Sequence, residues 1–300
     1  MLNPRQLLPA LIVCALLPLS GAAQKRLRVA VLDFGGTEAG VRAAEKLSRV
    51  IAADAGRSLI DREESRAAAR GAGYAGSLNM TLDEARDLGG ALGSDFYVTG
   101  DAQTLRRSPS SGPHYFEAYA SLFVVSSRTG RLILWDRPSF EAASPEEAEK
   151  NLLKELEQRA AGYGRAVARA HESELSERAQ VIERAAAPLP VVTDAPEDEG
   201  AAARAGLRLP QPYRRLRPTY PESASRAEAE ATVDVKVEID AEGEVSRVEV
   251  VRWAGFGLDE ATVATVRQLH FTPARLNGTP VPLRFLLRYN FRKPVEEGKR

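Results

Sequence analysis

The stretch TVDVKVEIDAEGEVSRVEVV, residues 232–251, decides the fold of the C-terminal part of the chain. From Thr232 to Asp240 its valines and isoleucine alternate with polar residues, which predicts a strand with one buried face and one solvated face. The sequence from Asp240 to Gly243 has turn composition, and Val245 to Val251 returns to an extended pattern. The stretch therefore predicts an antiparallel hairpin.

A helix and two further strands are predicted after this hairpin. Residues 257–269 (GLDEATVATVRQL) favour a helix, because Asp259 and Glu260 place negative charge in its first turn. Residues 271–275 and 282–291 have strand composition and flank Asn277-Gly278, a dipeptide typical of tight hairpin turns, so we expect them to pair across it. The C-terminal part is predicted to be a small ββαββ domain.

The first part of the chain predicts a domain of mixed α/β structure. Helical periodicity covers residues 39–55 and 81–92, with Gly56 and Gly93 as the expected ends. In the second helix, Thr81 is followed three residues later by a glutamate, which is a capping-box pattern. Strands are predicted at residues 27–34, 58–61, 95–100, 115–126 and 132–135.

Residues 144–218 are predicted to join the two domains. Residues 144–186 have helical composition, and the later half of this helix, from His171, is polar and is expected to project into solvent. Residues 187–218 mix prolines, alanines and acidic residues, as in a semi-extended linker. The whole chain is thus expected to be α+β, with an N-terminal domain at 25–143 and a C-terminal domain at 219–300.

Residues 1–24 have the features of a signal peptide that is removed after export. Arg5 supplies the positive charge, residues 7–19 are apolar, and residues 20–23 (SGAA) are small. The apolar run is shorter than the ~20 residues that a spanning helix needs, which favours cleavage over a retained membrane anchor. Lipid attachment at Cys14 is not expected, because Val13 precedes it where a small residue is needed.

Composition and charge exclude several classes of function. Lysine and arginine together number 41, as do aspartate and glutamate, so no net field draws the chain to nucleic acid. Cys14 is the only cysteine, and its loss with the signal peptide would leave no disulfide, thiol nucleophile or cysteine ligand. No nucleic-acid partner is expected.

No catalytic or metal-binding motif stands out, so we expect neither an enzyme nor a cofactor. The three histidines are His114, His171 and His270. They fall in different predicted elements and lack the convergent ligands that a metal site requires. The glycine-rich residues 71–76 lack the Lys-Ser/Thr of a phosphate-binding loop. Trp135 and Trp253 lie in or beside predicted strands and are expected to be packing anchors.

Five short patterns follow one another between residues 219 and 292. They are Tyr220-Pro221 before the first strand, Asp240 to Gly243 in the hairpin turn, Gly255 with Leu258 and Asp259 at the helix start, Phe271 with Pro273, and Asn277-Gly278. In this order they resemble the C-terminal domain of the TonB family. Their role is expected to be structural.

The resemblance implies a partner and a location. In that family the small domain docks peptide segments of outer-membrane transporters by adding a strand to its sheet. It implies a periplasmic protein that binds an outer-membrane transporter or another envelope protein and supports transmembrane transport. Membrane association would then come through partners or, as the alternative, through an uncleaved inner-membrane anchor of a TonB energy transducer. The long proline-rich spacer usual in the family is not present here.

Four polar residues on the last predicted strand are candidates for partner contact. They are Arg284, Arg288, Asn290 and Arg292. The arginines would suit an acidic or carboxylate-rich partner. The alternative interpretation is that charges on a solvated edge strand prevent aggregation without any partner.

The first domain has a weaker resemblance of its own. Residues 29–34 (VAVLDF), Asp61-Arg62, residues 88–93 and Val98 to Gly100 are similar to segments of the CsgG family of curli secretion and of the N-terminal domain of TolB-like proteins. This likeness, over residues 27–140, implies an alternative function as an envelope assembly or secretion component.

Overall fold

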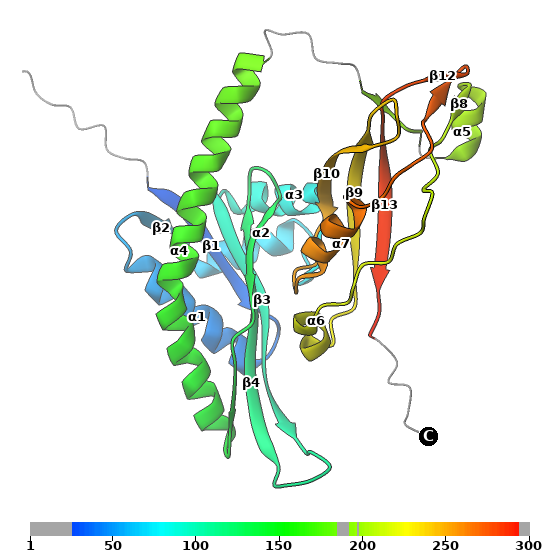
Figure 1. The fold of residues 1–300 in the computed structure, drawn as a ribbon. Coiled ribbons are helices and arrows are strands. Elements are labelled where there is room, and N and C mark those ends of the chain that lie inside the picture. Colours follow the sequence, from blue (N-terminus) through cyan, green and yellow to red (C-terminus); the bar gives the residue numbers. More distant parts are fainter. Residues whose placement is uncertain (1–25, 185–191, 197, 294–300) are drawn as a thin grey trace, which may run out of the picture.

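The computed structural model describes residues 26–184, 192–196 and 198–293. Two units, each built on a β-sheet, lie side by side in these residues (Figure 1). The expected α+β architecture is confirmed. The expected signal peptide, residues 1–24, lies outside the described residues. In the part of the chain that the structure describes, no helix is both long enough and apolar enough to cross a membrane.

The N-terminal unit contains a mixed sheet in the order β2-β1-β3-β4-β5, and β6 also pairs with β4. The strands are β1 (Leu27–Phe34), β2 (Arg57–Leu59), β3 (Phe96–Arg107), β4 (Tyr115–Ser126), β5 (Leu132–Asp136) and β6 (Ser139–Ala142). β1 runs parallel to β2 and β3, and the other pairs are antiparallel. The predicted β4–β5 hairpin is confirmed, whereas β6 was not predicted.

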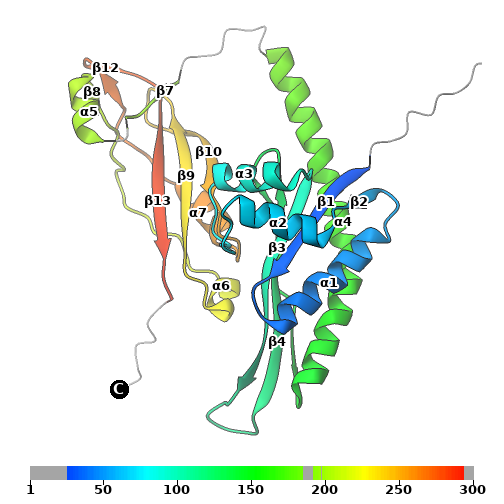
Figure 2. The ribbon, with the colours of Figure 1, turned by 180° about the vertical axis from the view of Figure 1, so that it is seen from behind.

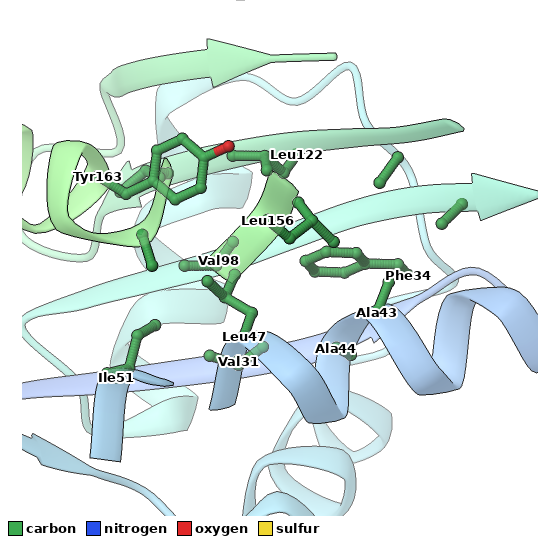
Figure 3. Close-up of a cluster of buried hydrophobic side chains, with 14 of the residues drawn as sticks. Val31, Phe34, Ala43, Ala44, Leu47, Ile51, Val98, Leu122, Leu156 and Tyr163 are labelled. Carbon is green, nitrogen blue, oxygen red and sulfur yellow. The ribbon is translucent and has the colours of Figure 1, made fainter. Parts of the chain in front are cut away.

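Helices cover both faces of this sheet. On one face, α1 (Glu38–Ala52) and α4 (Pro145–Arg184) enclose a core that includes Phe34, Leu47 and Leu156 (Figure 3). On the other face lie α2 (Arg62–Gly71) and α3 (Leu82–Leu92). The capping box of α3 is confirmed. α1 ends before the predicted Gly56, because the Asp54 carboxylate accepts from the Gly56 N–H and turns the chain toward β2.

The predicted long helix is α4, and most described side chains of its later half, from His171, are exposed as expected. Glu174 is the one buried side chain among them. Glu174 is 8% exposed and accepts from Arg128 Nε at 3.0 Å and from Thr129 Oγ1 at 3.2 Å. Arg128 and Thr129 lie in the turn between β4 and β5. The polar surface of α4 is therefore held to this turn by hydrogen bonds, which hydrophobic periodicity does not reveal. Beyond this contact, Val181 is 66% exposed.

The C-terminal unit contains a four-stranded sheet in the order β10-β9-β13-β7. Its elements are β7 (Thr193–Asp194), α6 (Glu222–Ala227), β9 (Ala231–Ile239), β10 (Val245–Arg252), α7 (Leu258–Val266) and β13 (Leu283–Phe291). The predicted β9–β10 hairpin is confirmed. β13 pairs antiparallel with β9 along its whole length.

The second predicted hairpin is wrong in its partners. Asn277 and Gly278 have φ of 50° and 88° and form the expected tight turn, but they join only β11 (Arg275–Leu276) to β12 (Thr279–Pro280). Pro280 and Pro282 have no N–H to donate, so the ladder cannot continue past them. β13 instead turns its apolar face onto the core beside β9.

The predicted linker, residues 187–218, also needs correction. It contains α5 (Glu199–Arg204) and β8 (Leu207–Arg208), and β8 pairs with β11. Ala202 and Leu207 are 1% and 6% exposed and belong to the C-terminal core. The segment has the composition of a linker, but a few apolar residues among its polar ones are enough to bury part of it in this core.

Candidate partner-binding edge

The C-terminal unit is fixed to the N-terminal unit through Trp253, which is 1% exposed. Its ring stacks on Phe123 of β4 with 5.7 Å between centroids, and its Nε1 donates to the Gly130 carbonyl at 3.0 Å. Its backbone N–H donates to the Met80 carbonyl. The expectation that Trp253 is a packing anchor is confirmed, and the core that it enters is that of the other unit.

Asn79, which precedes α3, forms a second junction between the units. Its Nδ2 donates to the carbonyls of Thr232 and Trp253 at 2.8 and 2.6 Å, and its Oδ1 accepts from the Thr232 N–H. Arg252 completes the junction by donating to the Asn79 carbonyl. One amide side chain thus holds the start of β9 and the end of β10 against the N-terminal unit.

This docking makes the two edges of the C-terminal sheet unequal. At the end of β10, Arg252 and Trp253 pair with Thr81 and Met80, and Glu249 accepts from Arg131 beside β5. β13 lies on the side of the sheet away from the N-terminal unit (Figure 2). The outer edge of β13 therefore lies farther from the N-terminal unit than the outer edge of β10.

Side chains on the polar face of β13 are held in place by hydrogen bonds and ion pairs to side chains of β9. Arg288 donates from Nε and one terminal nitrogen to both carboxylate oxygens of Asp234 at 2.7 and 2.9 Å. Arg284 pairs with Glu238 in the same register, at 3.0 Å from Nε. Asn290 Oδ1 accepts from Thr232 Oγ1 at 2.8 Å.

Three of the four candidate contact residues are therefore already engaged within the sheet. Arg292, the fourth, follows the end of β13 and is exposed. The candidates share one face, as the alternation predicted, but the side chains of Arg284, Arg288 and Asn290 are held by β9.

The direction of the backbone groups follows from one hydrogen bond. The Ala195 N–H donates to the Arg284 carbonyl at 2.7 Å from the side opposite β9. Backbone groups of alternate residues point to the same edge of a strand. Leu286, Arg288 and Asn290 therefore direct their N–H and C=O groups outward. Among the described residues, no strand pairs with these groups.

The family-motif residues serve the fold of the C-terminal unit. Asp240 accepts from the backbone N–H groups of Glu242 and Glu244, and Gly243, at φ 91°, lies where a Cβ would meet the Phe271 carbonyl at 2.1 Å. Tyr220 donates to the Ala229 carbonyl at 2.7 Å. Four others begin α6 or α7, pack in the core or close the short turn: Pro221, Leu258, Phe271 and Gly278. Gly255 and Asp259 shape the loop before α7, where a Cβ at Gly255 would meet the Phe123 ring at 2.6 Å. Pro273 lies beside Gly243.

Asp259 is a buried carboxyl group that holds the loop before α7. Its two oxygens accept from the N–H groups of Ala254 and Gly255 at 2.9 and 2.8 Å. This loop carries Phe256, whose ring contacts Phe123 and Trp135 of the N-terminal unit. Burial raises the pKa of Asp259 from 3.8 to about 6, although the two backbone N–H groups favour the ionised form.

We expect Asp259 to make the protein less stable as the pH rises from about 4 to about 6. Its pKa is higher in the folded state than in the unfolded chain, so its stabilising contribution is complete below pH 4 and is lost above pH 6. The loss should be on the order of 3 kcal/mol. Urea unfolding of the wild type and Asp259→Asn across this range checks it. Parallel pH profiles for the two proteins would contradict the assignment.

A cavity of about 350 Å³ lies between β5 and β10. Its lining includes Trp135, Trp253, Arg131 and Glu249. In the described parts of the chain, no group of three or more His, Cys, Asp or Glu side chains is placed to hold a metal ion. His270 pairs with Glu244, while His114 and His171 lie at the edges of single phenylalanine rings.

The C-terminal unit is a small α+β domain in which the outer edge of β13 carries outward-directed backbone groups. Residues 217–292 match the family model described as the Gram-negative bacterial TonB protein C-terminal, so this part of the chain is a TonB C-terminal domain. The resemblance seen in the sequence is confirmed. The domain makes this an envelope-associated protein. The comparison with curated proteins gives no match.

Solved structures resemble parts of the chain at low identity. The hypothetical protein CT253 from Chlamydia trachomatis is 15% identical, with a TM-score of 0.34, over 46% of this chain and 97% of that chain. The lipoprotein GNA1162 from Neisseria meningitidis is 14% identical, with a TM-score of 0.32, over 46% and 96%. The LpoB C-terminal domain from Salmonella enterica is 15% identical, with a TM-score of 0.27, over 38% and 81%. Likenesses this low assign no function.

Proposed function

We propose that the protein is a periplasmic, non-enzymatic binding protein that adds an extended segment of an envelope protein to the outer edge of β13. The observation that carries this proposal is the outward direction of the backbone groups of Leu286, Arg288 and Asn290, to which no described strand pairs. An edge strand of this kind offers main-chain hydrogen bonds for affinity and alternate side chains for selectivity.

The partner is proposed to be an outer-membrane transporter, so that binding supports transport across the envelope. The TonB C-terminal domain at residues 217–292 supports this choice. The docking through Trp253 and Asn79 supports a further role for the N-terminal unit, which is to present β13 outward. Cross-strand ion pairs keep the edge strand ordered before a partner arrives.

Synthetic peptides can test the proposal. Fluorescein-labelled peptides of about ten residues, taken from the periplasm-exposed segments of outer-membrane transporters, are titrated with the protein and followed by fluorescence anisotropy. We expect saturable micromolar binding for at least one of them, and loss of binding when alternate amides of that peptide are N-methylated. The absence of saturable binding across the panel would contradict the proposed function.

A further inference from the structure

One end of the proposed binding edge is already occupied by the chain itself. β7 pairs in parallel with the start of β13, with Thr193 opposite Leu283 and Asp194 opposite Arg284. The Ala195 N–H donates to the Arg284 carbonyl at 2.7 Å. The Arg284 guanidinium also lies 3.3 Å from a carboxylate oxygen of Asp194. β7 and Ala195 thus occupy the outward backbone groups of Arg284 that a partner strand would use.

β7 is tethered next to this edge. Only a few residues separate it from α5, where Asp198 caps the helix and Ala202 is buried in the C-terminal core. β8 then pairs with β11. A segment tied so closely to its site has an effective concentration in the millimolar range, so even weak pairing keeps it in place much of the time.

The contact is nevertheless weak enough to be displaced. β7 has two residues, both of them exposed. The Asp194 side chain is 73% exposed, and an ion pair in such surroundings is screened by solvent. Among the described residues, the pairing of this segment with β13 ends at Ala195.

We propose that β7 is a built-in competitor that a partner strand must displace from Leu283 and Arg284 to use the full edge. This inference rests on the proposed function and adds its regulation. While β7 is paired, the outward groups of β13 at Leu286, Arg288 and Asn290 have no strand partner among the described residues. The apparent affinity of the full edge for a partner is then its intrinsic affinity multiplied by the fraction of molecules in which β7 is unpaired.

Substitution of Ala195 tests the competition in the full-length chain. Ala195→Pro removes the N–H that donates to Arg284, whereas the control Ala195→Ser keeps it. The probe is the tightest-binding labelled peptide from the panel described above. We expect Ala195→Pro to bind it about fivefold to twentyfold more tightly than the wild type, and Ala195→Ser to bind like the wild type. Asp194→Asn should show a smaller gain of about twofold to threefold.

The outcomes separate this inference from the proposed function. Tighter binding by Ala195→Pro but not by Ala195→Ser supports competition by β7. Equal affinities for wild type and Ala195→Pro would overturn the inference and leave strand addition standing. If no peptide of the panel binds either protein, the proposed function fails and the inference fails with it.

Discussion

Replacing Leu286 with proline is expected to weaken peptide binding by at least about tenfold while the protein stays folded. The Leu286 N–H points to the outer edge of β13, so proline removes a donor that a partner strand would use and none that β9 uses. The ring also obstructs a strand approaching along that edge. A lost ladder bond and the steric conflict together account for this magnitude. Anisotropy titration measures the affinity, and thermal unfolding measures the fold.

Leu286→Thr is the matched control, because it keeps the N–H and suits a strand. The Leu286 side chain is 51% exposed, so neither substitution creates a cavity. We expect Leu286→Thr to bind the peptide within about threefold of the wild type. Unchanged binding by a folded Leu286→Pro protein would exclude the outer edge of β13 as the binding site.

Replacing Trp253 with alanine is expected to lower the free energy of unfolding by about 3–5 kcal/mol, since it leaves a large cavity at the junction of the units. The ring is 1% exposed, stacks on Phe123 and donates to the Gly130 carbonyl. Because Trp253 belongs to the C-terminal unit and packs in the N-terminal core, we also expect the two units to unfold in separate transitions. Urea unfolding followed by circular dichroism measures both effects.

Trp253→Phe separates the two contributions of this residue. It keeps an aromatic ring against Phe123 and removes the Nε1 donor, so we expect a loss of about 1–2 kcal/mol and a single transition. A loss below about 1 kcal/mol for Trp253→Ala would contradict the view that Trp253 joins the units.

Strong local patterns in the sequence predicted much of the fold. Alternation from Thr232 to Asp240 is visible because one face of β9 is apolar core and the other carries polar residues, of which Asp234 is buried beneath Arg288. The Asn277-Gly278 turn was equally clear, but its strands were not, because β13 pairs with β9 more than forty residues away in the chain. Local sequence specifies a turn more strongly than it specifies which strands pair.

The candidate site was predicted only in part. Alternation placed Arg284, Arg288 and Asn290 on one face, as observed. Their engagement by Glu238, Asp234 and Thr232 depends on the register of two distant strands, which the sequence does not show. The residues around β7 were interpreted as linker because two paired residues leave no periodic signal.

Both junctions between the units also escaped prediction. Asn79 lies in a loop with ordinary turn composition, and its contacts with Thr232 and Trp253 join residues more than 150 positions apart. The apolar side chains around Trp253 come from both units. Only the tertiary arrangement brings these groups together.

The most direct test of strand addition is residue-resolved amide hydrogen exchange of the protein with and without the bound peptide. We predict slower exchange at Leu286, Arg288 and Asn290, whose N–H groups would gain partners, and unchanged exchange along β10. Protection along β10 or around the cavity between β5 and β10, with no change at those three amides, would contradict the account.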